Sequence, residues 1–226
     1  HQAEALVHAA ERAILGRDTD GLQLLDKLAQ AGRVDAQIGR LLAGLRDKGV
    51  TANVVVVADH GMAPVSKDRI IYMDDLAPAE SLNIITMGSS MELFPAPGHE
   101  AEVRHAVLGR HEHMTCWPKA KVPARLHFGT NPRIPPIVCL AETGWMIETH
   151  AGQAKRPMTY KGAHGFDPDD PAMRALFVAA GPDIRAGVVL PVFDNVDVYP
   201  LLARLIGVTP VKGDGDLAPL KPALAH

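Results

Sequence analysis

Two short segments of the chain carry residue types that bind metals and support hydrolytic chemistry. Asp59 and His60 are adjacent and are followed by Gly61, and His164 lies in the segment KGAHGFDP. A carboxylate oxygen and a neutral imidazole nitrogen are good ligands for Zn²⁺, and a glycine permits the tight turn that lets neighbouring side chains converge. Each segment alone also fits an ordinary interpretation, in which Asp59 caps the next element and both histidines are polar loop residues.

The elements around Asp59 predict a position at the edge of a sheet. Residues 53–58 read NVVVVA, and four successive valines are typical of a parallel strand buried on both faces. A helix at 33–48, with apolar residues at helical spacing and Gly49 as its stop, leads into this strand. Ligands of open α/β sheets bind at the carboxyl ends of the strands. The sequence therefore predicts an α/β frame with Asp59 and His60 at its ligand-binding edge.

The middle of the chain, residues 64–158, is predicted to be an inserted α+β region, because it is less regular and rich in proline and glycine. Its predicted elements are strands at 69–73, 83–87 and 91–94, a helix at 98–108, and a strand pair formed by 137–141 and 145–148 around Thr143-Gly144. Outside it we predict helices at 3–15, 19–30 and 195–206 (the last distorted by Pro200), strands at 175–179 and 188–190, and a surface tail after Gly207.

Taken in order, these segments resemble one known family. The valine-rich strand with DHGM, the later GAHGFDP, and then RALFVAAGPDI and DNVDVYPLLARLIGV resemble the nucleotide pyrophosphatase/phosphodiesterases of the alkaline-phosphatase superfamily. Residues 131–136 with 137–145 resemble the family's approach to its Glu-x-Gly-Trp turn. The similarity runs from about residue 33 to residue 224. It implies that residues 1–226 form the C-terminal portion of one alkaline-phosphatase-like catalytic domain, with a mostly parallel central sheet flanked by helices.

The resemblance also implies a site with two zinc ions. The family's Asp-His pair, here Asp59 and His60, ligates one zinc, and its later histidine, here His164, ligates the other. The family's threonine nucleophile lies before the aligned part, so no catalytic residue is assigned in this chain. A further Asp-x-x-x-His ligand pair has no counterpart before Asp59, and Glu4 with His8 is the nearest substitute but lies too early. The chain therefore carries about half of the expected ligands.

Two other groups of candidate ligands have simpler interpretations. His111-Glu-His113 would present both histidines to one face of a strand, but a solvated turn is the favoured interpretation. Asp167, Asp169 and Asp170 resemble a calcium loop only loosely, because their spacing fits no EF-hand.

The function that follows is hydrolysis of phosphodiester or pyrophosphate bonds in a small-molecule substrate, expected to be a nucleotide. The alternatives are a catalytically silent fragment or degenerate homologue, and another hydrolase of the superfamily (a phosphomonoesterase, sulfatase or phosphonate hydrolase). The net charge of −3 gives no electrostatic reason to expect a nucleic-acid-binding surface. No apolar run approaches the roughly 20 residues of a membrane span.

Three properties stay open at this point. Cys116 and Cys139 could pair or could both be buried thiols. The oligomeric state is not predicted. The compartment is also open, although the resemblance favours the periplasm or the extracellular space.

Overall fold

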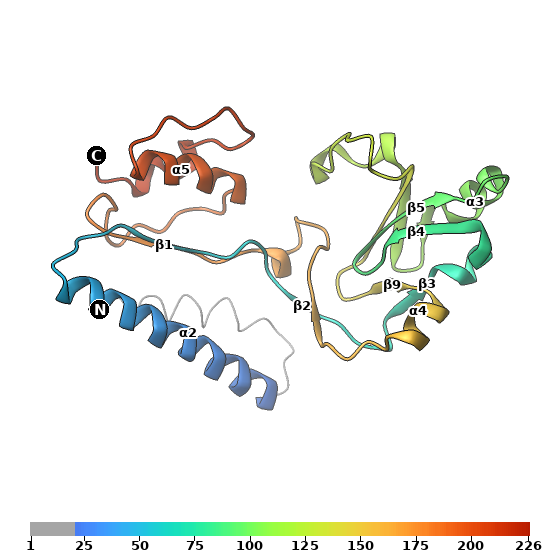
Figure 1. Ribbon diagram of the computed structural model, residues 1–226, viewed down its shortest axis with the longest axis horizontal. Helices are drawn as coiled ribbons and strands as arrows, with labels where there is room; N and C mark the ends of the chain where they lie inside the picture. The colour runs from blue at the N-terminus through green and yellow to red at the C-terminus, as the bar shows by residue number, and fades with distance from the viewer. Residues whose placement is uncertain (1–20) are drawn as a thin grey trace. The chain divides into compact units, whose positions relative to one another are not determined.

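The computed structural model describes residues 21–226, and the chain divides into two compact units (Figure 1). The first unit contains the described residues up to Asp59 together with Ala175–His226, and the second unit is His60–Arg174. The helix predicted at 3–15 lies outside the described residues. The predicted insertion, 64–158, falls inside the second unit, and its status as an insertion into one catalytic domain stays a prediction.

The first unit begins with one long helix, α2 (Gly21–Asp47), where the sequence predicts two shorter ones. Its end is confirmed at Gly49, which has φ +68°. The Gly49 N–H donates to the Arg46 carbonyl at 2.9 Å and the Val50 N–H donates to the Leu45 carbonyl at 2.9 Å. These two bonds form a Schellman motif, which satisfies carbonyls that the helix itself leaves without partners.

The valine-rich segment forms strand β1 (Val54–Val57), which pairs with β11 (Phe177–Ala180). The pairing is antiparallel, so the parallel arrangement expected for this strand is absent from the described pair. The strand is also half-exposed, with Val57 at 43%. A run of valines indicates that a strand is suited to burial, but it carries no information about the direction of the neighbouring strand. The sequence therefore did not determine whether β1 pairs in parallel or antiparallel.

The C-terminal part of the first unit packs on a small core of its own. A 3₁₀ turn, η6 (Asn195–Asp197), leads into helix α5 (Val198–Leu205), and Pro200 lies in its first turn, where no backbone N–H is required. The chain after Gly207 does not simply cover the surface: η7 (Ala218–Ala223) places Leu220 in contact with the buried cluster of the unit. Residues 188–190 form no strand in the described structure.

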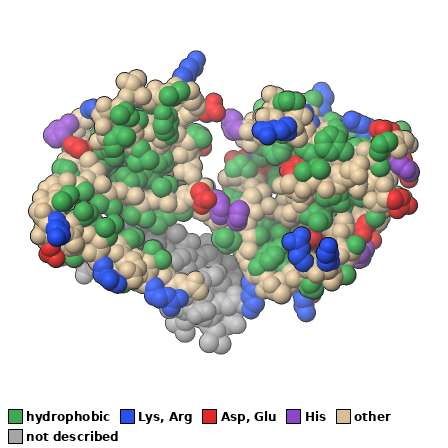
Figure 2. All heavy atoms as spheres, viewed as in Figure 1, with side chains coloured by type: hydrophobic (Ala, Val, Ile, Leu, Met, Phe, Trp, Pro, Cys, Tyr) green, Lys and Arg blue, Asp and Glu red, His purple; other side chains and the backbone are tan. Residues whose placement is uncertain are grey.

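Large apolar side chains remain exposed on the first unit. Figure 2 shows hydrophobic side chains gathered on its surface over β1 and α5. The most exposed include Val34, Leu41, Val189, Val192 and Ile206. The helical spacing of apolar residues predicted helices in this unit correctly. The described residues nevertheless leave much of the apolar surface of α2 and α5 exposed. Among residues 21–226, no helix is both long and apolar enough to cross a membrane.

The second unit is built on a five-stranded antiparallel sheet in the order β4-β5-β8-β7-β6. Its strands are β4 (Leu82–Thr86), β5 (Ser90–Pro95), β6 (Gly109–His111), β7 (Met114–Pro118) and β8 (Ile137–Ala141). Helix α3 (Glu100–Val107) buries Val103 and Val107. The strands predicted at 83–87, 91–94 and 137–141 and the helix predicted at 98–108 are confirmed within a few residues.

The strand pair predicted around Thr143-Gly144 is wrong, although both of its strands exist. β8 pairs with β5 and β7, while β9 (Met146–Glu148) pairs in parallel with β3 (Ile70–Tyr72). Helix α4 (His150–Lys155) follows β9. A short turn between two strands looks the same in sequence whether or not the strands pair, and here each strand finds a partner that is distant in the chain.

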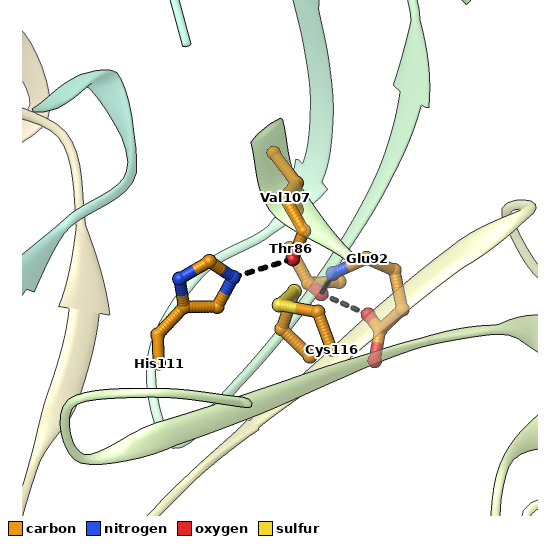
Figure 3. The surroundings of a disulfide bond; sticks show 6 residues. Thr86, Glu92, Val107, His111 and Cys116 are labelled. Atoms are coloured by element: carbon orange, nitrogen blue, oxygen red, sulfur yellow. Dashed lines mark hydrogen bonds between the residues drawn. A yellow bond between two sulfur atoms is a disulfide. The ribbon is translucent and has the colours of Figure 1, made fainter. Parts of the chain in front are cut away.

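Cys116 and Cys139 form a disulfide, which settles the question left open by the sequence. They lie directly opposite each other on β7 and β8, with Cα atoms 4.0 Å apart, and both side chains are buried. Figure 3 shows their surroundings, where the His111 ring donates to the Val107 carbonyl at 2.8 Å. The bond thus joins two central strands inside the main core of the second unit.

Glu148 on β9 gives the second unit a pH-dependent contribution to stability. Burial raises the pKa of this carboxyl, and the charge of Arg156 opposes the effect. When folding raises the pKa of a carboxyl, its protonation stabilises the fold, and this contribution is fully present below the pKa of the unfolded chain, 4.5. The contribution disappears as the pH rises through the higher pKa of the folded protein.

We therefore expect Glu148→Gln to increase the free energy of unfolding at pH 7 by less than about 1 kcal/mol, because the group is partly solvated. The gain should vanish at pH 4. Urea unfolding at both pH values measures it, with the exposed Glu80→Gln as control. A gain of equal size at pH 4 and pH 7 would contradict the assigned cause.

Candidate metal centre

A two-stranded ribbon brings His60 and His164 together. β2 (Ala63–Pro64) pairs with β10 (Gly162–Ala163) antiparallel, with Ala63 opposite Ala163, and the ladder continues at the Val65 N–H. His60 precedes β2 and His164 follows β10, so the antiparallel pairing puts both histidines at the same end of this ribbon. Their rings stack with centroids 3.7 Å apart and planes 15° from parallel. Two histidines that are distant in sequence therefore lie side by side within the second unit.

Gly61 holds the chain beside this histidine pair through a close backbone approach. Its N–H donates to the Met173 carbonyl at 2.9 Å, in the 3₁₀ turn η5 (Pro171–Met173). A Cβ atom on Gly61 would lie 2.8 Å from the Arg174 carbonyl oxygen and closer still to that of Ala172. The glycine is thus needed because another backbone segment occupies the space of a side chain, whereas the sequence suggested only a tight turn.

The hydrogen bond of His60 defines which of its ring nitrogens carries a lone pair. Nδ1 lies 2.8 Å from the carbonyl oxygen of Gly61. A carbonyl only accepts hydrogen bonds, so Nδ1 carries the hydrogen and the lone pair of the neutral ring is on Nε2. Histidines that ligate metals commonly donate their other N–H to a carbonyl in this way. The donor chemistry of His60 therefore fits a zinc ligand.

Asp59 is fixed through its backbone at the end of β1. The Ala58 N–H donates to the Leu176 carbonyl at 2.9 Å, and Asn195 Nδ2 donates to the Asp59 carbonyl at 2.9 Å. The side chain of Asp59 is exposed, as is His164, while His60 is half-buried. Asp59 belongs to the first unit and the two histidines to the second.

The three candidate ligands are thus one stacked pair and one carboxylate that precedes it in the chain. Within residues 21–226, no group of three or more His, Cys, Asp or Glu side chains is arranged to hold a metal ion. The donor types of Asp59, His60 and His164 fit zinc, and the described residues supply a partial set. Their role as ligands remains a proposal.

His111 and His113 have structural roles in the second unit. His111 ends β6, and His113 lies in the turn between β6 and β7, where it adopts φ +61°. The His113 ring stacks on Trp145 at 3.7 Å, and its Nδ1 lies 2.9 Å from a carboxylate oxygen of Glu142. That contact is the main cause that lowers the pKa of Glu142. The geometry agrees with the turn interpretation and gives both residues other partners.

The three aspartates after His164 also have protein partners. Asp170 caps η5 by accepting the Ala172 N–H at 2.8 Å. Asp167 and Asp169 both bind Arg125, at 2.7 Å and 2.9 Å from its Nη1. No local sequence pattern points to Arg125, because its partners lie more than 40 positions away.

The sequence of this chain is similar to those of known proteins. A family model described as type I phosphodiesterase / nucleotide pyrophosphatase matches residues 24–167. Bis(5'-adenosyl)-triphosphatase enpp4 of Xenopus laevis is 31% identical over 195 residues, covering 85% of this chain and 42% of that protein. The chain therefore spans about two fifths of the length of this relative.

The structure of this chain is similar to solved structures of other proteins. Human ectonucleotide pyrophosphatase/phosphodiesterase 5 superposes with a TM-score of 0.83 at 27% identity, over 94% of this chain and 55% of that one. The murine protein, solved as an inactive variant in complex with AMP, has a TM-score of 0.82 at 24% identity, over 100% of this chain and 64% of that one. These matches confirm the alkaline-phosphatase-like α/β fold class, although the described strands do not form the parallel central sheet. The chain belongs to the type I phosphodiesterase / nucleotide pyrophosphatase family.

Proposed function

We propose that this chain takes part in metal-dependent hydrolysis of phosphodiester or pyrophosphate bonds in nucleotides. The observation that carries the proposal is the stacked pair of His60 and His164 in a chain of this family. A relative of the same fold was solved in complex with AMP, which supports a nucleotide as the substrate class. Asp59 and His60 are proposed to ligate one Zn²⁺ and His164 a second.

The residues of this chain would hold and orient the metals. Zinc, when bound, would stabilise negative charge on a phosphoryl group and activate a nucleophile. His60 presents Nε2 because its Nδ1 is occupied by the Gly61 carbonyl. Gly61 is itself held by Met173. His164 is held in place by the β2–β10 ribbon. Backbone contacts therefore help to hold both proposed histidine ligands.

Zinc titration by calorimetry tests the ligand assignment. We expect the chain to bind zinc, and His60→Ala or His164→Ala to raise the zinc Kd about tenfold or more, as expected when a metal site loses an orienting group or a ligand. His105→Ala, on the exposed side of α3, is the matched control and should leave Kd unchanged. Equal affinities in all four proteins would exclude these histidines as ligands.

Substrate assays separate the remaining alternatives. Hydrolysis of a nitrophenyl nucleotide ester by the zinc-loaded chain supports the phosphodiesterase assignment. Zinc binding without turnover supports the silent homologue instead. Faster turnover of monoesters, sulfate esters or phosphonates than of diesters supports another hydrolase of the superfamily.

A further inference from the structure

Arg125 makes a branched ion pair with the segment that follows His164. Its Nη1 donates to Asp167 Oδ1 at 2.7 Å and to Asp169 Oδ2 at 2.9 Å, and its Nη2 donates to Asp167 Oδ2 at 2.5 Å. The two parallel bonds to Asp167 form a bidentate pair, which fixes direction as well as distance. Arg125 lies in η4 (Ala124–Leu126), and its partners lie 42 and 44 positions further along the chain.

This contact completes the support of the backbone around His164. On one side, β10 pairs with β2 immediately before the histidine. On the other, Phe166 is buried in the main core at 4% exposure. Asp167 then meets Arg125 and also accepts the Asp169 N–H at 3.0 Å. His164 itself is exposed, so its position depends on these flanking anchors.

We propose that Arg125 is a positioning residue for His164: its bidentate contact with Asp167 fixes the backbone of residues 164–170 and so directs the His164 imidazole toward a metal. The inference rests on the proposed function, because it takes His164 to be a zinc ligand. A guanidinium suits this task, since its planar fork matches a carboxylate, while a lysine ammonium offers only a point charge.

The ion pair between Arg125 and Asp167 is formed at neutral pH. The hydrogen bond from Arg125 is the main cause that lowers the pKa of Asp167 below 3.8. A carboxyl with a lowered pKa stays ionised, and so keeps its ion pair, at any pH above its pKa in the folded protein. The ion pair is lost only as the pH falls through that folded-state pKa. Zinc titrations at pH 7 to 8 therefore test the contact in its formed state.

The test compares the zinc Kd of the chain with that of Arg125→Ala, Arg125→Lys and Asp167→Asn. We expect Arg125→Ala and Asp167→Asn each to raise the zinc Kd about tenfold. The double variant Arg125→Ala/Asp167→Asn should raise Kd little further, because both changes remove the same contact. Arg125→Lys should give a Kd between those of the parent chain and Arg125→Ala, because it keeps the charge but loses the bidentate geometry. Arg110→Ala removes a comparable exposed ion pair, with Glu142, and should leave Kd unchanged.

A second measurement does not depend on zinc. Amide hydrogen exchange over residues 164–170 should be at least fivefold faster in Arg125→Ala than in the parent chain and unchanged in Arg110→Ala. If the parent chain binds zinc and the Arg125 variants bind it equally well, the inference is wrong and the proposed function stands. If the parent chain binds no zinc, the proposed zinc site fails, and unchanged exchange would then overturn the positioning role as well. Should Arg125→Ala not fold, Arg125→Lys provides both readouts.

Discussion

Gly61→Ala is expected to destabilise the second unit by about 3 kcal/mol or more, at the upper end for overpacking a tight contact. The new methyl group would overlap the carbonyl oxygen of Ala172 and the backbone of Met173, neither of which can rotate away as a side chain does. Relief requires η5 to move, which breaks the bond from the Gly61 N–H to the Met173 carbonyl. Because His60 is the adjacent residue, zinc affinity should fall together with stability.

Urea unfolding of the second unit, followed by the fluorescence of its tryptophans, measures this effect. Gly44→Ala is the matched control: it makes the same change inside α2, where nothing lies within 4 Å of the added atom. Because α2 belongs to the first unit, this change should leave the unfolding midpoint of the second unit unchanged. If Gly61→Ala also leaves that midpoint unchanged, the backbone contact at Gly61 does not have the role described.

Removal of the disulfide is expected to destabilise the second unit by about 3 kcal/mol. Cys116 and Cys139 are 23 positions apart, and the entropy of closing a loop of that length in the unfolded chain gives this magnitude. The double variant Cys116→Ala/Cys139→Ala should also lose some packing, because both sulfur atoms are buried in the main core.

Comparison with the reduced parent chain separates the two contributions. Reduction removes the cross-link and keeps the sulfur atoms, so the reduced chain should unfold at a lower urea concentration than the oxidised chain and at a higher one than the double variant. An oxidised and a reduced chain with the same midpoint would show that the cross-link adds no stability. Zinc affinity should change little in either case, since the disulfide lies in the five-stranded sheet and not in the β2–β10 ribbon.

Local sequence patterns determined the elements of this protein and the residue types of its candidate site. Local patterns located most of α2, helix α3 and the strands β3, β4, β5, β8 and β9 of the second unit, because burial preference and backbone propensity act over a few neighbouring residues. They did not predict β6 and β7. Gly49 marked the end of α2 because only a residue tolerant of positive φ suits that position. Asp59, His60 and His164 were identified by their chemistry, and the order of their segments indicated the family.

Only the tertiary structure decided what those elements and residues meet. The direction of β1 against β11, the separate partners of β8 and β9, and the pairing of Cys116 with Cys139 all depend on residues far apart in the chain. The stacking of His60 on His164 follows from the two-residue strands of the β2–β10 ribbon, which are too short to leave a pattern in sequence. Likewise, Arg125 could be identified only from its contact with Asp167, because long-range ion pairs leave no periodic pattern in the sequence. The sequence specified which groups could bind a metal, and long-range backbone pairing decided which of them lie together.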